Sequence, residues 1–301
     1  MTLIQTPRSK RSARLLAPVL LLALIACLFA SAATAGAAVP KRIVALTPFA
    51  ANTLVKLGVT PIGIGQTVGG NERFDPRLAD VTVLPLSHPN GPNLEQLATL
   101  RPQLVLSTKT WAKGNAAIAD LGIKVVTREP VRVNGVFDKT LAIGELVGKL
   151  PEAKQLVALE KAAIGRSRRD ITRRPRVMVI LGVGHSPFTF LPNSWGGDIV
   201  RKAGAEILAG GLKAGSGFER ISDEVVVAEN PQVIIVVPHG DPENVGAIAA
   251  YFAKDPAWGS TSAAKHGRIY VSTNNSLLQA GTDIGHTIEE IRVDYLHNWP
   301  R

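Results

Sequence analysis

The feature that most constrains the fold of this 301-residue chain is an internal repeat. Segments beginning at Asn93 and at Ser222 share one plan at an offset of 129 residues: a capping residue, a short helix, a proline and an uninterrupted apolar run. Asn and Ser are common helix N-caps, and proline ends a helix. The apolar runs at 104–106 and 233–237 are typical of parallel strands covered on both faces. The repeat therefore predicts two similar α/β halves.

The rest of the chain alternates between strand and helix patterns. We expect strands at 41–46, 61–65, 124–127, 175–180 and 268–272, and helices at 50–57, 115–121, 195–203, 243–253, 258–266 and 283–296. This alternation favours an α/β fold of two doubly wound, Rossmann-like lobes with a ligand cleft between them. The predicted lobes span residues 36–133 and 175–301.

Residues 134–174 form a predicted helical connector, because they contain no strand-like stretch. Pro151 stands where a new helix would begin, so 151–170 predicts one long helix of roughly 30 Å. Such a connector limits the relative motion of two lobes to modest bending or twisting. Its far end carries arginines, which we interpret as a solvated helix end and not as a nucleic-acid patch, since no aromatic residues lie between them. These are Arg166, Arg168, Arg169, Arg173, Arg174 and Arg176.

The first 35 residues have the pattern of a secretory signal. Cations precede an apolar run at 15–29, which is short for a membrane-spanning helix of about 20 residues, and small residues follow at 31–38. Cleavage after Ala35 removes four cations and lowers the formal charge from +10 to +6. The cations are Arg8, Lys10, Arg11 and Arg14. The mature protein is therefore expected to be mildly basic and extracytoplasmic.

The single cysteine, Cys27, lies within this segment, so no intramolecular disulfide is expected. Residues 24–27 resemble a bacterial lipobox, in which Cys27 would become the lipidated first residue. The alternative is an ordinary apolar cysteine, which the continued apolar run through Leu28 and Phe29 favours. Both routes place the protein outside the cytoplasmic membrane.

Candidate binding residues follow the strands, because ligands of open parallel sheets bind beyond the C-terminal strand ends. Aromatic rings there suit a ligand with flat or apolar surfaces, although aromatics after strands also pack cores, as we expect of Trp195 and Trp258. Lys109 and Arg73 would suit a ferric siderophore, whose oxygen ligands are negatively charged. The candidates are Thr47, Phe49, Lys109, Trp111, His185, Phe190 and His239.

A series of short motifs extends over residues 40–298. It comprises Arg42-Ile-Val-Ala-Leu-Thr-Pro48, Leu57-Gly58, Pro92-Asn-Leu-Glu95, Arg101-Pro-Gln-Leu-Val-Leu106, Trp195-Gly-Gly-Asp-Ile-Val200, Ala203-Gly204, His239-Gly-Asp-Pro-Glu243, Asp255-Pro-Ala-Trp258 and Gly267-Arg-Ile-Tyr-Val271. In order and spacing this series resembles the substrate-binding proteins of ABC importers for iron complexes and cobalamin. The fold of that family, two α/β lobes joined by one long helix, agrees with the pattern of strands and helices.

The resemblance implies that a monomeric, non-enzymatic protein binds an iron complex between its lobes, most simply haem or a ferric siderophore, and delivers it to an ABC permease. Cobalamin is the alternative cargo, and no intrinsic cofactor is implied. In haem-binding members a histidine at the position of His239 ligates iron, and the second ligand precedes the helix that follows Pro92. His88 lies in that neighbourhood, so the resemblance implies His239 and His88 as haem ligands, a role that neutral imidazole suits.

In the same family an acidic residue on each lobe docks to the permease. Asn52 stands where glutamate is usual on the first lobe, and Asp198 is the candidate on the second. The resemblance therefore implies an altered docking contact on the first lobe.

Other classes of function have weaker support. A secreted two-domain enzyme remains an alternative, but the chain has no Gly-x-Ser-x-Gly, Walker or His-Glu-x-x-His motif, and residues 182–184 are only a fragment of a dinucleotide fingerprint. A zinc carrier would need clustered histidines and carboxylates, whereas the six histidines are scattered in sequence. Secretion argues against nucleic acid as a partner.

Overall fold

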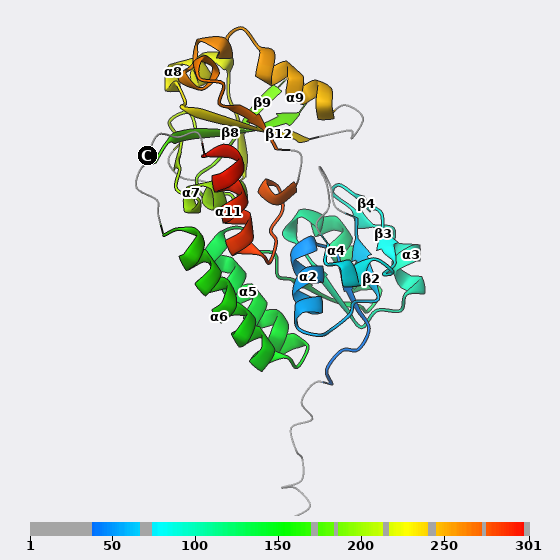
Figure 1. Cartoon of the computed structure of the whole chain (residues 1–301). Coiled ribbons are helices and arrows are strands. Elements are labelled where there is room, and N and C mark those ends of the chain that lie inside the picture. Colours follow the sequence, from blue (N-terminus) through cyan, green and yellow to red (C-terminus); the bar gives the residue numbers. More distant parts are fainter. Residues whose placement is uncertain are drawn as a thin grey trace, which may run out of the picture. The chain divides into compact units, whose positions relative to one another are not determined.

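The computed structural model describes residues 38–66, 74–169, 174–183, 186–212, 217–239, 245–272 and 275–297 (Figure 1). The predicted signal segment with Cys27, and also Arg73 and His185, lie outside these residues. The chain from Pro40 onward forms one structural unit. Among the described helices, none has both the length and the apolar character needed to cross a membrane.

The first sheet is parallel and has five strands. Its order is β3 (Val83–Leu84), β2 (Gly63–Gly65), β1 (Ile43–Ala45), β6 (Leu104–Ser107) and β7 (Lys124–Thr127). From β1 the chain adds β2 and β3 on one side and then crosses over to add β6 and β7 on the other side. β1 and β6 are neighbours, and Ala45 lies opposite Leu106. The C-terminal ends of β1 and β6 therefore form a topological switch point, the place where open α/β sheets bind ligands.

Helices cover both faces of this sheet. Around it lie α2 (Pro48–Lys56), α3 (Leu94–Thr99), α4 (Ala112–Asp120), the 3-10 turns η1 (Pro76–Leu78) and η2 (Lys109–Trp111), and a hairpin of β4 (Leu86–Ser87) and β5 (Gly91–Pro92). Successive side chains of a strand point to opposite faces. Ile43 and Ala45 accordingly pack with α2, whereas Val44 packs with α3 and α4.

The second sheet is mixed. Its order is β11 (Phe218–Arg220), β9 (Ser186–Phe190), β8 (Arg176–Val183), β12 (Val233–His239) and β13 (Ile269–Val271), with β10 (Glu206–Ile207) beside the start of β8. β9 pairs in antiparallel fashion with both β8 and β11, and the other pairs are parallel. The sequence analysis missed this antiparallel edge, because Pro187 interrupts the strand pattern of β9 and all three residues of β11 are exposed.

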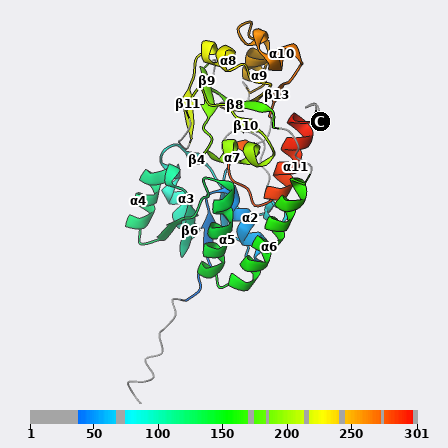
Figure 2. The same ribbon diagram turned by 90° about the vertical axis from the view of Figure 1, so that its left-hand side faces the viewer.

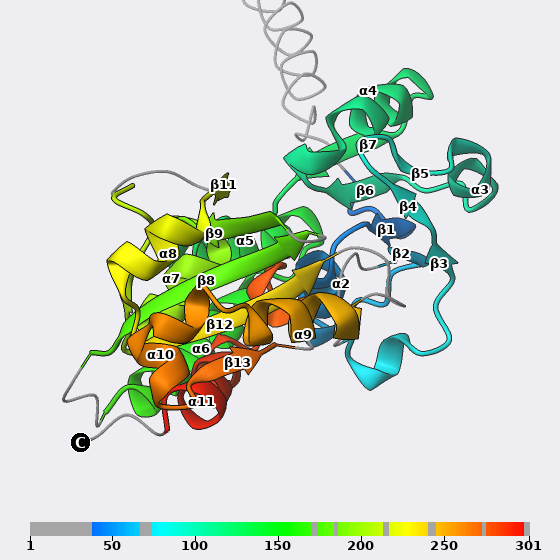
Figure 3. The ribbon, with the colours of Figure 1, turned by 90° about the horizontal axis from the view of Figure 1, so that it is seen from above.

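Helices also lie on both faces of the second sheet. They are α7 (Trp195–Lys202), α8 (Asp223–Glu229), α9 (Val245–Lys254), α10 (Ser262–Lys265), α11 (Ile284–Tyr295) and the turns η4 (Trp258–Ser260) and η5 (Asn275–Leu277). Figure 1 shows α8 and α9 on one side of the sheet and α7 and α11 on the other, and Figure 3 shows α9 and α10 over β12 and β13. The two sheets lie within the predicted lobes 36–133 and 175–301, whose boundaries stay predictions.

The predicted elements are mostly confirmed within a few residues. The strand at 124–127 is β7, and Asn93 caps α3 by accepting a hydrogen bond from the Gln96 N–H at 2.9 Å. Ser222 begins α8 without a side-chain capping bond. The helix expected at 258–266 is instead η4 followed by α10, because Thr261 is extended and caps α10.

The connector consists of two helices, α5 (Val133–Leu146) and α6 (Leu150–Ser167), that lie side by side (Figures 1 and 2). Pro151 lies in the first turn of α6, as expected, and the helix ends before the predicted residue 170. On α6, the Glu160 carboxylate accepts hydrogen bonds from the first amides of α11, Ile284 N–H at 3.0 Å and Gly285 N–H at 3.4 Å. The connector is thereby fixed to the last helix of the chain.

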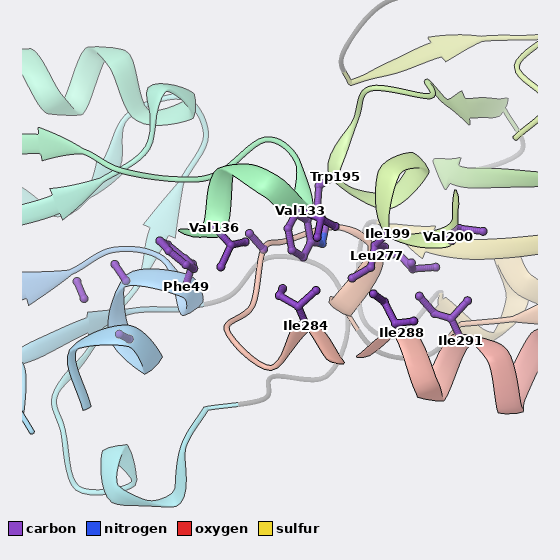
Figure 4. Packing of buried hydrophobic residues seen from close by; sticks show 14 of the residues in the cluster. Phe49, Val133, Val136, Trp195, Ile199, Val200, Leu277, Ile284, Ile288 and Ile291 are labelled. Carbon is purple, nitrogen blue, oxygen red and sulfur yellow. The ribbon is translucent and has the colours of Figure 1, made fainter. Parts of the chain in front are cut away.

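One apolar cluster joins the two sheets. It runs from Phe49 of α2 through Val133 and Val136 of α5 to Trp195 of α7 and Ile284 of α11 (Figure 4). Burial of apolar surface is the main favourable contribution to folding. The cluster therefore holds the C-terminal strand ends of both sheets in one fixed relation.

Two helical glycines test the α6–α11 contact. A Cβ at Gly285 would lie 2.4 Å from the Ala163 Cβ, whereas a Cβ at Gly165 would meet nothing within 4 Å. We expect Gly285→Ala to lower the free energy of unfolding by about 1–3 kcal/mol through overpacking. The matched Gly165→Ala should raise it by about 0.5–1 kcal/mol, since alanine is the better helix former. Urea denaturation measures both, and equal shifts would contradict tight α6–α11 packing.

Candidate functional site

A cavity of about 560 Å³ lies where the strands of both sheets end. We call it the apolar cavity. The first sheet contributes the residues that follow β1, β6 and β7, and the second contributes the ends of β8 and β12 and the segment after β13. Its aromatic and polar lining residues are Thr47, Gln66, His88, Thr108, Thr110, Trp111, Glu129, Ser194, Trp195, Phe218, His239 and Gln279. This volume is typical of small-molecule sites.

Half of the residues proposed from sequence line this cavity: Thr47, His88, Trp111 and His239. Phe49 and Phe190 do not line it, because both side chains are fully buried in the apolar cluster. Their expected role as ligand contacts therefore does not fit their positions. Lys109 lines a separate, more polar cavity.

Aromatic side chains enclose the apolar cavity from both sheets. Trp111 is buried and meets His88 edge-on, with ring centroids 5.9 Å apart. Trp195 packs the start of α7, as expected, and its Nε1 donates to the Ser276 carbonyl at 2.7 Å. It also lines the cavity, as does the partly exposed Phe218, so the sequence analysis missed two aromatic lining residues. Together these rings offer apolar surface to a flat ligand.

His239 is the last residue of β12, opposite Val183 of β8. It is half-buried, and its Nδ1 is buried with no partner among the residues the structure describes. Burial lowers the pKa of His239, so the ring is neutral near neutral pH. A neutral imidazole can ligate a metal through the lone pair of a ring nitrogen.

Glu129 is a lining residue that the sequence analysis missed. Its carboxyl accepts hydrogen bonds from the Thr47 hydroxyl and from the Ala280 N–H, so it lies between the ends of the two sheets. Burial raises the pKa of Glu129 from its ordinary 4.5 to about 7, and within the described part of the chain Oε2 has no partner. The signal was present, since Glu129 follows β7 just as Thr47 follows β1.

The apolar cavity carries little charge. No lysine or arginine is among its described lining residues, and its titratable groups are His88, Glu129 and His239. The described residues also contain no cluster of three or more His, Cys, Asp or Glu side chains that could hold a metal ion. The cavity therefore offers aromatic surface and imidazole, and no cationic anchor from the described chain.

Comparison with known proteins identifies relatives of this chain. Residues 43–275 match the model of the periplasmic binding protein family. The chain belongs to that family. A cobalamin-binding protein of Halobacterium salinarum is 29% identical over 242 residues, which are 78% of this chain and 64% of the relative, so the match spans less than two thirds of that protein. The haem uptake protein IsdE of Staphylococcus aureus is 25% identical over 235 residues, 76% of this chain and 78% of IsdE.

The fold is shared with solved structures. An ABC transporter substrate-binding protein from Listeria monocytogenes EGD-e superposes with a TM-score of 0.74 at 24% identity, covering 85% of this periplasmic binding protein and 99% of the other chain.

The two residues considered for permease docking are not on the surface of this periplasmic binding protein. Asp198 is 2% exposed, accepts a hydrogen bond from the Val133 N–H at 2.8 Å and pairs with Arg201. Asn52 is also buried, and its Oδ1 accepts from the Asp75 N–H at 2.9 Å. Asp198 thus caps α5, and its expected docking role does not fit its burial.

The stability of the protein should reflect Glu129. The pKa of Glu129 in the folded state, about 7, exceeds the ordinary 4.5. Its contribution to the free energy of unfolding is therefore fully present below pH 4.5 and is lost as the pH rises through 7. The loss is at most about 3 kcal/mol by linkage. We expect Glu129→Gln to flatten the stability profile between pH 5 and 8, approximate limits set by that linkage.

Thermal unfolding of the ligand-free protein across this range measures the effect. Glu95→Gln, at an exposed position of α3, serves as the control and should keep the wild-type profile. His239 has the opposite effect on stability. Because its pKa is lowered in the folded state, its contribution to the free energy of unfolding is present above pH 6.5 and is lost as the pH falls. An unchanged slope in Glu129→Gln would show that the carboxyl is not buried as described.

Proposed function

We propose that this periplasmic binding protein captures a metal tetrapyrrole, haem or a corrinoid, outside the cytoplasmic membrane and delivers it to an ABC permease without catalysing a reaction. The observation that carries the proposal is the neutral, half-buried His239 in a cavity walled by aromatic rings. The names of two relatives, one for cobalamin and one for haem, support the same ligand class.

A tetrapyrrole fits the apolar cavity for two reasons. Its flat faces can pack against Trp111 from one sheet and Trp195 and Phe218 from the other. Its central metal can accept the lone pair of His239, a bond that an enclosed site shields from water. Apolar burial then supplies affinity, and the coordinate bond distinguishes metal-containing rings from free porphyrins.

A ferric siderophore fits the described lining less well. Its anionic oxygens would be desolvated in a cavity to which the described residues contribute no lysine or arginine. Lys109, proposed earlier for that purpose, lines the other cavity. We therefore place the siderophore second.

His88 is the candidate for a second axial ligand. It lines the apolar cavity from the half of the chain that holds the first sheet, whereas His239 comes from the second sheet. His88 is exposed and its ring meets Trp111 edge-on. The bis-histidine arrangement stays a prediction, as do the signal segment at residues 1–35, lipidation of Cys27 and the monomeric state. Since Asp198 and Asn52 are buried, docking to the permease would use different residues, ones that lie on the surface.

Parallel titrations test the proposal. We expect hemin or hydroxocobalamin to bind with a spectral change, a Soret shift for hemin or a shifted corrin band for hydroxocobalamin, while ferric citrate binds weakly. His239→Ala should abolish the spectral change and weaken binding about tenfold or more, because it removes the metal–imidazole bond.

His266→Ala is the matched control, since His266 is an exposed histidine at the end of α10. It should titrate like the wild type. Tight binding of ferric citrate with no response to either tetrapyrrole would refute the proposed ligand class.

A further inference from the structure

A second cavity of about 500 Å³ adjoins the apolar cavity. Thr108, Glu129, Pro130 and Val131 line both and form a shared wall. The other lining residues come from the end of the first sheet, the first turns of α5, and α7. We call it the polar cavity.

The charges of the polar cavity contrast with those of its neighbour. It is lined by four basic residues, Lys109, Arg132, Lys139 and Arg201. Besides Glu129 on the shared wall, its acids are Asp138 and Asp198.

Asp198 is already engaged in the fold. Its carboxylate is held by the Val133 N–H and by Arg201. Among the described lining residues, the remaining cations, Lys109, Arg132 and Lys139, therefore share the polar cavity with one further carboxylate beyond the shared wall, that of Asp138.

An apolar cavity and a cationic cavity that share a wall suit a ligand with two kinds of surface. We propose that the polar cavity holds an anionic arm, a carboxylate or a phosphate, of the same ligand whose ring occupies the apolar cavity. The inference rests on the proposed function and names the part of the ligand that sets its orientation. Lys109 and Arg132 are the main anion-binding side chains, because each directly follows a residue of the shared wall, Thr108 or Val131, and both are exposed to an incoming ligand.

The experiment compares each tetrapyrrole with a partner that lacks the anion. Hemin is paired with hemin dimethyl ester, which has no free carboxylate, and hydroxocobalamin is paired with aquacobinamide, which lacks the phosphate-linked nucleotide. The first pair tests a carboxylate arm and the second a phosphate arm. Each is titrated into the wild type and into Lys109→Glu/Arg132→Glu.

We expect the double variant to bind the anionic member of one pair about tenfold or more weakly, and to bind the partner that lacks the anion within about twofold of the wild type. Lys109→Gln/Arg132→Gln should give an intermediate loss. The affinity of the wild type for the anionic member should also fall with added salt, unlike that for its partner.

Lys154→Glu/Lys265→Glu is the matched control, because it makes the same change in net charge at two exposed positions outside both cavities. It should leave all affinities within about twofold. If Lys109→Glu/Arg132→Glu keeps wild-type affinity, or weakens both members of a pair equally, the anionic subsite is wrong while the proposed function stands. If the wild type binds neither hemin nor hydroxocobalamin, both are wrong.

Discussion

The apolar cluster that runs from α2 through α5 and α7 to α11 determines where this protein can bind a ligand. Each sheet contributes one face to that cluster, so neither sheet can turn without exposing apolar surface. The C-terminal strand ends of both sheets consequently meet around one cavity. Two Rossmann-like sheets on a flexible linker would have the same candidate residues without a defined site.

Two carboxylates, the buried Asp198 and the half-buried Glu160, hold helix N-termini at this junction. Asp198 of α7 accepts from the first amide of α5, and Glu160 of α6 accepts from the first amides of α11. A carboxylate removed from water without a hydrogen-bond partner destabilises the fold, and the first N–H groups of a helix have no acceptor within the helix. Each contact therefore satisfies both the carboxylate and the helix start. Because these contacts join segments far apart in the chain, they restrict how far the sheets can separate.

Local patterns in the sequence predicted most of the parallel strands and most helices, because burial of alternate or continuous apolar residues is visible within a few positions; the two-residue strands β3 and β10 were too short to show such a pattern. The strand-end rule also proposed Thr47, Trp111 and His239, which line the apolar cavity and whose contact with a ligand stays a prediction. The same rule proposed Phe49 and Phe190, whose side chains are buried in the apolar cluster, since it locates the backbone and not the direction of a side chain. Asp198 looked like a surface acid for a related reason: its partner, Val133, lies 65 residues earlier. Glu129 could have been found by applying the rule to every strand.

The contrast between the two cavities suggests how affinity and orientation are divided. In the apolar cavity, rings such as Trp111 and Trp195 favour any flat apolar molecule, and the proposed metal–imidazole bond of His239 would distinguish one that carries a metal. Neither interaction fixes the rotation of a ring about its metal–nitrogen bond. A charged arm held in the polar cavity would fix that rotation, because it would tie one edge of the ring to Lys109 and Arg132. Cations placed in the apolar cavity would instead stabilise smaller anions and reduce selectivity for the tetrapyrrole.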